Sequence, residues 1–536
     1  MAGPAPPPPA AAWRSWWRRH GAVILGAAAV WAVALAVRLP DLDASVNIDA
    51  AWQWFRRTRA FFDALAAGDP AGTFQVHPGV TLMWLVGLSI GTDAVVPLTP
   101  ATIAAGALPV AWVTSLIAPG SFLLTRRILG PRALDAAAVL GLLLATEPFL
   151  VGHGRTAHLD ALLTTFGWLG AGAALWAWRR GRWSAAVLAG VCLGLAVLTK
   201  VAGGAIALGV GLSALLGLAR PRRARRLALL AATTATALGV AFALWPALRA
   251  DPAGTLERLI AEVTGQVDRG HRVYFGGLYY AQDPGPAYYL AVLAARLSPE
   301  VAVAAVAGLV VLLVPGRRRA AARRALAALL GAYAVLALAQ IEAPKKIDRY
   351  VLPFFPPLAA LATVAIVGAA RAVAGRRRWV AFALPLALLG GVRLARLADV
   401  HPHAIAWSQD WPGWPAGHGV TLGFGEGLRE AALWIRADAG DHRPRVFSGM
   451  YRPCVEPWLD FRESRLADAE YQIRYISVIQ RGFRAKEYAR DMRGLLHQVV
   501  IDGRVWVEIH AGPRYRGPTR PGYSIPWRRP PTAPKR

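Results

Sequence analysis

The amino-acid sequence predicts a mainly α-helical protein that crosses a membrane many times and carries a small α/β domain near its C-terminal end. Hydrophobic residues make up 55% of the 536 residues and charged residues only 17%, and the mean hydropathy is +0.37. Apolar runs recur from Gly21 to Leu397, many near the ~20 residues that cross a bilayer as a helix. After Val400 come spaced charges and short β-prone runs, such as 445–451 and 471–480, which are typical of a water-exposed domain.

The charge pattern indicates a membrane protein and not a nucleic-acid-binding one. The formal net charge is +28, but most Arg residues before position 400 lie in short clusters between apolar runs. Such clusters orient membrane proteins, because Lys and Arg near the ends of a span favour the cytoplasm. We therefore expect no nucleic-acid partner. The two cysteines, Cys192 and Cys454, lie in different parts of the chain and predict no disulfide framework.

One assignment of spans puts the Arg clusters on a single side of the membrane. It has about eleven crossings, with about 11–13 as the range, and treats the first apolar run as an uncleaved anchor. Counting 79–97 as a further span is the alternative, and it would place Arg126 and Arg127 outside unless another span is added. The predicted spans are 21–37, 103–125, 134–150, 160–178, 184–199, 202–219, 227–247, 299–314, 325–341, 351–370 and 379–397.

This assignment also divides the chain into segments. It predicts a cytoplasmic N-terminal segment over 1–20 and a membrane domain over 21–399 with outer loops 41–95 and 249–297. An extracytoplasmic α/β domain follows over 400–512, and the Pro- and Arg-rich tail 513–536 is expected to be disordered.

The first candidate site residue is Asp49, which follows the first predicted span. It lies among large aromatic residues that could desolvate its carboxylate and raise its basicity, so we expect a catalytic base. The alternative is a helix N-cap beside an interfacial aromatic belt. His77, at a turn entering the next apolar helix, is a candidate substrate contact, although a lone His at such a turn is usually structural.

A second group lies at the outer start of the span 160–178. Arg155 and His158 are three residues apart and would share a helical face, with Asp160 close by, so their side chains would project toward one cavity mouth. We expect Arg155 to bind a phosphate and His158 a substrate. Asp160 is a candidate catalytic carboxylate, and helix capping is its alternative role.

Basic residues on the outer side form a third group. The chain contains only five lysines, and Lys200, Lys345 and Lys346 lie at outer membrane boundaries with Arg349 nearby. Ammonium and guanidinium groups there suit a phosphate whose negative charge grows as it leaves. Snorkelling to lipid phosphates is the alternative.

The outer loop 249–297 supplies a rigid turn that bears aromatic residues. Its candidate substrate-binding residues are Asp283 and Tyr288, since such a turn could cover a site or stack on a sugar. A plain surface turn is the alternative.

Taken in this order, these segments resemble the GT-C membrane glycosyltransferases, in the branch of the protein O-mannosyltransferases and the lipid A aminoarabinose transferase. A further run, 423–428 with Glu430, Ala431 and Ala432, resembles a bacterial subgroup with an outer C-terminal extension. The stretches that carry the resemblance in the membrane part are 49–58, 77–84, 155–163, 195–200, 283–289 and 345–353.

The resemblance implies a GT-C-like fold in a bacterial plasma membrane. It also implies a polyprenyl-phosphate sugar donor, an outward-facing site, an extracytoplasmic acceptor, and inversion at the anomeric carbon with Asp49 as the base. Many relatives have Asp-Glu where this chain has Asp49-Ala50, and Asp160 could supply the second carboxylate. We expect no cofactor; the sequence indicates no metal ligands, and the departure at Ala50 leaves a divalent metal open.

Two other functions remain alternatives. Charges inside or beside a membrane also mark the substrate pathway of a lipid or sugar flippase, although transporters commonly show internal repeats and none is evident here. A noncatalytic assembly protein would use the outer domain 400–536 to bind a cell-wall polymer, with Trp407, Trp411 and Trp414 as a stacking surface.

Overall fold

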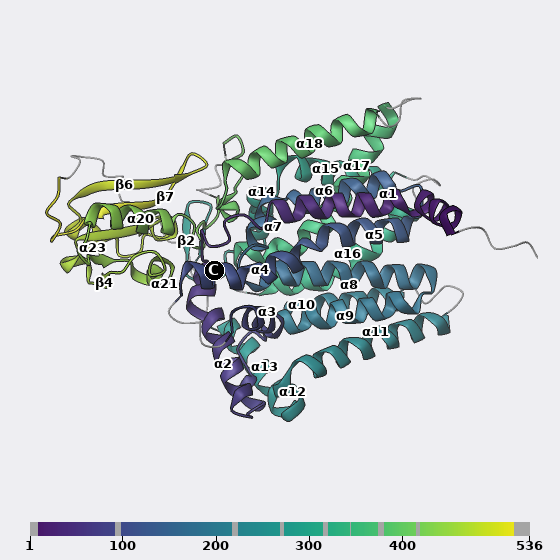
Figure 1. Cartoon of the computed structure of the whole chain (residues 1–536), viewed down its shortest axis with the longest axis horizontal. Coiled ribbons are helices and arrows are strands. Elements are labelled where there is room, and N and C mark those ends of the chain that lie inside the picture. Colours follow the sequence, from purple (N-terminus) through teal and green to yellow (C-terminus); the bar gives the residue numbers. More distant parts are fainter. Residues whose placement is uncertain are drawn as a thin grey trace, which may run out of the picture.

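The protein consists of a bundle of long helices and a strand-containing domain that caps one end of the bundle (Figure 1). The computed structural model describes residues 9–91, 98–216, 223–268, 273–314, 320–343, 345–373, 380–413 and 419–518. The predicted disordered tail 513–536 therefore lies mostly outside the described residues.

The bundle is built from apolar helices that lie side by side (Figure 1). Every predicted span overlaps one of them, with the span 103–125 divided between α4 and α5. Their bounds are α1 (Pro9–Ala36), α4 (Pro100–Ser115), α5 (Ile117–Leu129), α6 (Leu134–Thr146), α8 (Leu159–Arg180), α9 (Trp183–Thr199), α10 (Ala202–Leu216), α11 (Arg223–Leu244), α15 (Pro299–Leu313), α16 (Ala320–Glu342), α17 (Phe355–Val373) and α18 (Val380–Asp399).

The lengths of these helices fit a multi-pass membrane protein. Within the described residues, five stretches are long and apolar enough to cross a membrane: Pro100–Leu129, Leu159–Arg180, Arg223–Leu244, Arg323–Glu342 and Asp348–Val373. Others are apolar but shorter: His20–Ala36, Val80–Ile90, Leu134–Thr146, Trp183–Thr199, Ala202–Leu216 and Pro299–Leu313.

Small residues let neighbouring helices of the bundle approach closely. Gly308 of α15 lies directly against the backbone carbonyl of Leu361 in α17, where a Cβ atom would collide. Close backbone approach is how helices associate in lipid, where burial of apolar side chains adds little. The Ala- and Gly-rich composition thus serves helix packing.

The Arg-rich helix ends lie together at one end of the bundle. The Arg371 side chain, in the last turn of α17, is 2.6 Å from Asp135 at the start of α6. The Arg225 side chain, at the start of α11, donates to the carbonyl of Gly181 just after α8 at 2.8 Å. Helices from distant parts of the sequence therefore present their basic ends to the same face, as the predicted spans require.

The loop elements lie across the opposite end. The first loop contains a π-helical turn, η1 (Ala50–Trp54), followed by α2 (Phe55–Ala66), η2 (Ala71–Thr73) and α3 (Val80–Ile90), and α2 runs across the bundle axis (Figure 1). At ~1.5 Å per residue, the 11 residues of α3 cover roughly half of a ~30 Å hydrocarbon core. The second loop contains α12 (Pro246–Ala250), α13 (Pro252–Asp268), β1 (Val273–Phe275), β2 (Leu278–Tyr280) and α14 (Ala287–Arg296).

The C-terminal domain is built on a five-stranded mixed sheet with strand order β4-β3-β5-β7-β6. Strand β3 is parallel to both β4 and β5, whereas β7 is antiparallel to β5 and β6. The prediction of β-structure over 471–480 was only half right, because strand β5 ends at Tyr475 and a helix begins at Ile476. The bounds are α20 (Leu428–Ala439), β3 (Arg445–Phe447), α21 (Arg452–Val455), β4 (Arg462–Glu463), β5 (Tyr471–Tyr475), α22 (Ile476–Arg481), α23 (Ala485–Asp491), β6 (Gly494–Ile501) and β7 (Arg504–Ala511).

Candidate active site

Two carboxylates and two cations meet at the end of the bundle that the C-terminal domain covers. Asp49 directly precedes η1, and Asp160 lies in the first turn of α8. Lys200 directly follows α9, and Arg349 lies in the short 3₁₀ helix η5 (Asp348–Phe354). These residues come from four separate segments, so the fold itself brings them together.

Arg349 bridges the two carboxylates. Its Nη2 donates a hydrogen bond to Oδ2 of Asp49 at 2.6 Å, and its Nε is 3.1 Å from Oδ2 of Asp160. Nζ of Lys200 donates to Oδ1 of Asp160 at 2.6 Å. The four side chains therefore form one ionic cluster.

His158 links the same two carboxylates from a third direction. Its Nδ1 accepts from the backbone N–H of Asp160 at 3.4 Å and so caps the start of α8. Its Nε2 lies 3.2 Å from Oδ2 of Asp49. Its Nδ1 also lies 3.3 Å from Oδ2 of Asp160, so the imidazole contacts both carboxylates.

The pKa of the Asp49 carboxyl differs from the sequence-based expectation of a raised basicity. Burial raises the pKa of the Asp49 carboxyl, but Arg349, His158 and Lys200 outweigh burial and hold that pKa well below its usual range. The predicted increase in basicity was therefore wrong for this cluster, since the sequence showed the neighbouring aromatic residues but not the cations.

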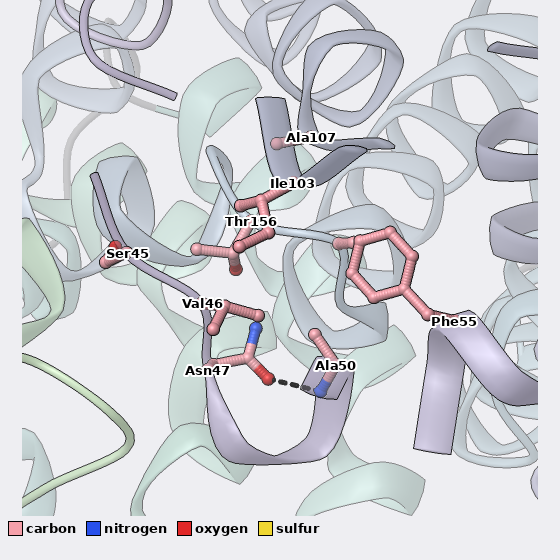
Figure 2. A pocket seen from close by; sticks show the side chains of 9 residues that line it. Ser45, Val46, Asn47, Ala50, Phe55, Ile103, Ala107 and Thr156 are labelled. Carbon is pink, nitrogen blue, oxygen red and sulfur yellow. Dashed lines mark hydrogen bonds between the residues drawn. The ribbon is translucent and has the colours of Figure 1, made fainter. Parts of the chain in front are cut away.

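Asn47, and not Asp49, caps the turn that carries the candidate base. Oδ1 of Asn47 accepts from the backbone N–H of Ala50 at 2.8 Å, whereas the Asp49 side chain makes no capping bond. Figure 2 shows this bond beside a cavity of about 10 Å³, room for about one water molecule. Figure 2 also shows Phe55, Ile103 and Thr156 around the same space. The capping alternative for Asp49 is therefore excluded, and its carboxylate is free for the ionic cluster.

The structure does not bring Arg155 into this cluster. Residues 154–157 form a turn and α8 begins only at Leu159, so the helical face expected for Arg155 and His158 does not exist. The buried guanidinium of Arg155 donates to the carbonyls of Pro40 and Asp41 and contacts His401. These partners occupy the guanidinium, so the structure gives no support to the predicted phosphate contact of Arg155.

Lys346 and Asp283 are also occupied elsewhere. The fully buried ammonium of Lys346 donates to the carbonyls of Ile341 and Ala343, each at 2.8 Å, and so caps the end of α16. It also lies 3.3 Å from Oδ1 of Asp283, which accepts from the backbone N–H of Gly285. Both side chains hold the outer loop in place. This agrees with the alternative in which Asp283 belongs to a turn and does not bind substrate.

Tyr288 and His77 differ in how they relate to the cluster. Tyr288 is buried and packs edge-on against Phe275, inside the loop region and not at its surface.

Burial, together with Lys200, Arg57 and Lys345, lowers the pKa of His77 to about 3, so this imidazole is neutral at neutral pH. Lys345 and His77 therefore lie in the same cationic surroundings as Lys200.

Two aromatic residues of the site were not predicted. Nζ of Lys200 lies 3.9 Å from the ring centroid of Tyr350, and the guanidinium of Arg349 lies 4.4 Å from the ring centroid of Phe424. Tyr350 directly follows Arg349 in the basic run, so that run carried a signal for it. Phe424 belongs to the C-terminal domain, and only its Gly-rich surroundings made it conspicuous.

The stacking surface expected of a polymer-binding protein is absent from the described part of the C-terminal domain. Trp407 is buried against Arg396, and Nε1 of Trp411 donates to the carbonyl of Ala294 at 2.9 Å. Trp414 lies outside the described residues. The two described tryptophans thus join the domain to the bundle.

Comparison with known proteins gives a family match within the membrane domain. Residues 98–247 match the family model described as dolichyl-phosphate-mannose-protein mannosyltransferase. This part of the chain is therefore similar to a family of membrane glycosyltransferases. The match includes Asp160 and Lys200 of the cluster, and it supports the resemblance found in the sequence. No curated protein matches the sequence of this chain.

Several solved structures are similar to this chain in outline. ArnT from Cupriavidus metallidurans in the apo state is 18% identical, with 92% of this chain and 98% of that chain covered and a TM-score of 0.49. AglB from Archaeoglobus fulgidus, in complex with an inhibitory peptide and a dolichol-phosphate, is 14% identical, with coverages of 94% and 75% and a TM-score of 0.48.

The described residues contain no group of three or more His, Cys, Asp or Glu side chains placed to hold a metal ion. In the cluster, the charges of Asp49 and Asp160 are balanced by Arg349 and Lys200.

Proposed function

We propose that this protein is a glycosyltransferase that moves a sugar from a polyprenyl-phosphate donor to an acceptor hydroxyl on the extracytoplasmic side, with inversion at the anomeric carbon. The observation that supports this proposal is the single cluster in which an accessible carboxylate, Asp49, lies beside two partly accessible cations, Arg349 and Lys200. A base and a phosphate-binding pair are the two components that such a transfer requires.

Asp49 is the proposed general base because it is the more accessible carboxylate. Its side chain is 24% exposed, whereas that of Asp160 is 1% exposed. An acceptor hydroxyl can reach Asp49 but not Asp160. Asp160 then orients Lys200, Arg349 and His158, which makes it a positioning residue and not a second base.

Lys200 and Arg349 are the proposed phosphate ligands. Their side chains are 17% and 14% exposed, so a donor can reach both. In the proposed step, the acceptor oxygen attacks C1 and gives its proton to Asp49. The bond between C1 and the phosphate oxygen breaks with both electrons on that oxygen, and the two cations stabilise the added negative charge.

The cluster also suggests how donor binding prepares the base. In the cluster, Arg349 and Lys200 hold the pKa of Asp49 down. A bound phosphate shares the charge of these cations, which weakens their effect on Asp49. Its proton affinity therefore rises when the donor is present, and the carboxylate is a weak base without it.

The proposed membrane orientation follows from the Arg-rich helix ends. Lys and Arg near span ends favour the cytoplasm, and the ends that carry Arg225 and Arg371 lie together, opposite the domain-covered end. The cluster and the domain 400–512 would then face outward and the segment 1–20 inward, in a bacterial plasma membrane. The acceptor would be a hydroxyl of a protein, a glycolipid or a polysaccharide on that outer side.

The experiment that tests the function is transfer of radiolabelled sugar from a small panel of polyprenyl-phosphate sugars in membranes. Wild type is compared with Asp49→Asn, a near-isosteric change that removes the base, and with Asp63→Asn as a matched control, because Asp63 is exposed on α2. We expect transfer by wild type and Asp63→Asn, and a rate about 10²–10⁴-fold lower for Asp49→Asn. Equal transfer by all three would discard Asp49, and no transfer from any donor by wild type would favour a flippase.

A further inference from the structure

The C-terminal domain reaches the catalytic cluster through one loop, residues 423–428. The carbonyl of Phe424 accepts from the backbone N–H of Ile48 at 2.9 Å, one residue before Asp49. Gly425 has a φ of 134° and lies against the same strand of chain, where a Cβ atom would be 2.5 Å from the carbonyl oxygen of Val46. This close approach requires glycine and fixes the loop beside the candidate base.

The Phe424 ring contacts two of the groups that hold Asp49. Its centroid is 5.2 Å from that of His158 in an edge-to-face arrangement, and the guanidinium of Arg349 lies over its face at 4.4 Å. A cation over a ring face and an edge-to-face ring pair are each favourable. Phe424 thus covers the side of the cluster that faces the C-terminal domain.

Buried hydrogen bonds set the position of Phe424 from within its own domain. Oε2 of the buried Glu426 accepts from the backbone N–H of Phe424 at 2.7 Å and from the hydroxyl of Tyr475 at 2.6 Å. Tyr475 is the last residue of β5. The loop is therefore fastened to the sheet, and any movement of the sheet moves Phe424.

A second contact beside the cluster joins the first loop of the membrane domain to the C-terminal domain. Nε1 of Trp52, in η1, donates to the carbonyl of Met450 in the C-terminal domain at 2.7 Å. The turn that carries Asp49 is thus attached to this domain on both sides, through Ile48 and through Trp52.

We propose that Phe424 is a positioning residue of the catalytic site, and that transfer requires the C-terminal domain to be docked so that this ring holds Arg349 and His158 against Asp49. The catalytic part of this inference rests on the proposed function. The C-terminal domain is then a structural component of the active site and not a separate binding module.

The test compares Phe424→Ala with Phe447→Ala in the full-length protein. Phe447 is a matched control, because it is buried in the same domain and also carries a guanidinium, that of Arg484, at 5.4 Å from its ring. Its ring packs against Tyr488, which lies outside the cluster. We expect Phe424→Ala to lower kcat on the order of 10²-fold, the scale of a small misplacement of catalytic groups, and Phe447→Ala to lower it far less. Phe424→Leu keeps most of the volume and replaces Phe424→Ala if the latter does not fold.

The pH profile separates positioning from general destabilisation. If Arg349 loosens, its effect on Asp49 weakens, the pKa of Asp49 rises, and the acid limb of the profile moves to higher pH. Destabilising the domain alone leaves that limb in place. The charged and titratable groups around Asp49 are Arg349, His158, Lys200, Asp160, Arg57, His77 and Cys454.

Hydrogen exchange gives a readout that does not depend on transfer. We expect faster exchange at Ile48 and in 345–350 for Phe424→Ala but not for Phe447→Ala. Equal effects of the two variants on exchange, kcat and pH profile would overturn the inference. If wild type transfers no sugar, the proposed function fails, and exchange alone still shows whether Phe424 holds the cluster.

Discussion

Two of the ionic clusters in the described part of the membrane domain differ in how accessible their central cation is. In the first, Asp49, Lys200 and Arg349 keep 24%, 17% and 14% of their side chains exposed. Nε of Arg349 and Oδ2 of Asp160 are buried and face each other at 3.1 Å. A ligand can still reach this cluster through the exposed parts of Asp49, Lys200 and Arg349.

The second cluster joins α6, α15 and α18, and its central cation is inaccessible. Arg393 is fully buried and donates from Nε to Thr146, from Nη1 to Glu300 and from Nη2 to Glu147. Glu147 in turn accepts from both the backbone and the hydroxyl of Ser298. Glu300, at the edge of this second cluster, is as exposed as Asp49, at 24%. Access to the central cation, 14% exposed for Arg349 and fully buried for Arg393, therefore distinguishes the candidate catalytic cluster from the structural one.

The largest expected effect on stability is that of Arg393→Met. This change leaves Glu147 buried without its cation, and breaking a buried ion pair on one side costs about 3–5 kcal/mol. Thermal unfolding in detergent should show a clear fall in Tm, while the donor KM of the protein that stays folded is unchanged. A changed donor KM with an unchanged Tm would reverse the roles given to the two clusters.

A smaller effect is expected to distinguish Lys200 from Lys346, both of which were predicted from the sequence to bind the donor phosphate. Lys200→Met removes a proposed phosphate ligand, and hydrogen bonds to charged groups contribute about 1.5–3 kcal/mol, so we expect kcat/KM to fall roughly 10- to 100-fold. Lys346→Met removes the cap of α16 and should lower Tm without a specific effect on the donor. Steady-state kinetics with varied donor, beside thermal unfolding, checks both. Equal losses of kcat/KM at equal stability would contradict the assignment.

A still smaller effect is expected in the pH dependence of Arg349→Met. Burial raises the pKa of Asp49, and Arg349 is the first of the groups that lower it. Without Arg349 the pKa rises, so the carboxylate is protonated at a higher pH and the acid limb of kcat/KM moves upward. Rate measurements across the acid range for this variant and wild type would show the shift. An acid limb that stays in place would mean that Arg349 does not act on the base.

The smallest effect is expected for Arg371→Ala at the opposite end of the bundle. This pair with Asp135 is solvent-exposed on the arginine side, and such pairs contribute about 0–1 kcal/mol. Transfer rate and Tm should both stay close to wild type. A large loss of activity would show that the basic end contributes more than orientation.

Much of the architecture could be predicted from the sequence, because a membrane span needs a long apolar run and such runs are visible without a structure. Asp49, His158, Asp160, Lys200 and Arg349 could also be selected, since charges at the outer ends of apolar helices are unusual. What could not be predicted was where each charge finds its partner. The sequence does not show that Lys346 caps α16.

The remaining errors have the same physical origin. Arg155 was assigned to a helical face, but the chain forms a turn there and α8 begins at Leu159. Phe424 carried no chemical signal of its own, because an aromatic residue in a Gly-rich run is common in packed domains. Only the docking of the C-terminal domain brings its ring to Arg349.

The most direct test of the central claim is single-turnover transfer by Asp49→Asn at a donor occupancy measured separately. General-base catalysis contributes about 10²–10⁴-fold in rate. We predict that the variant binds the donor at least as fully as wild type, because Arg349 and Lys200 remain, while its transfer rate falls by that factor. A rate close to that of wild type at equal occupancy would contradict the assignment of Asp49 as the base and, with it, the catalytic role of the accessible cluster.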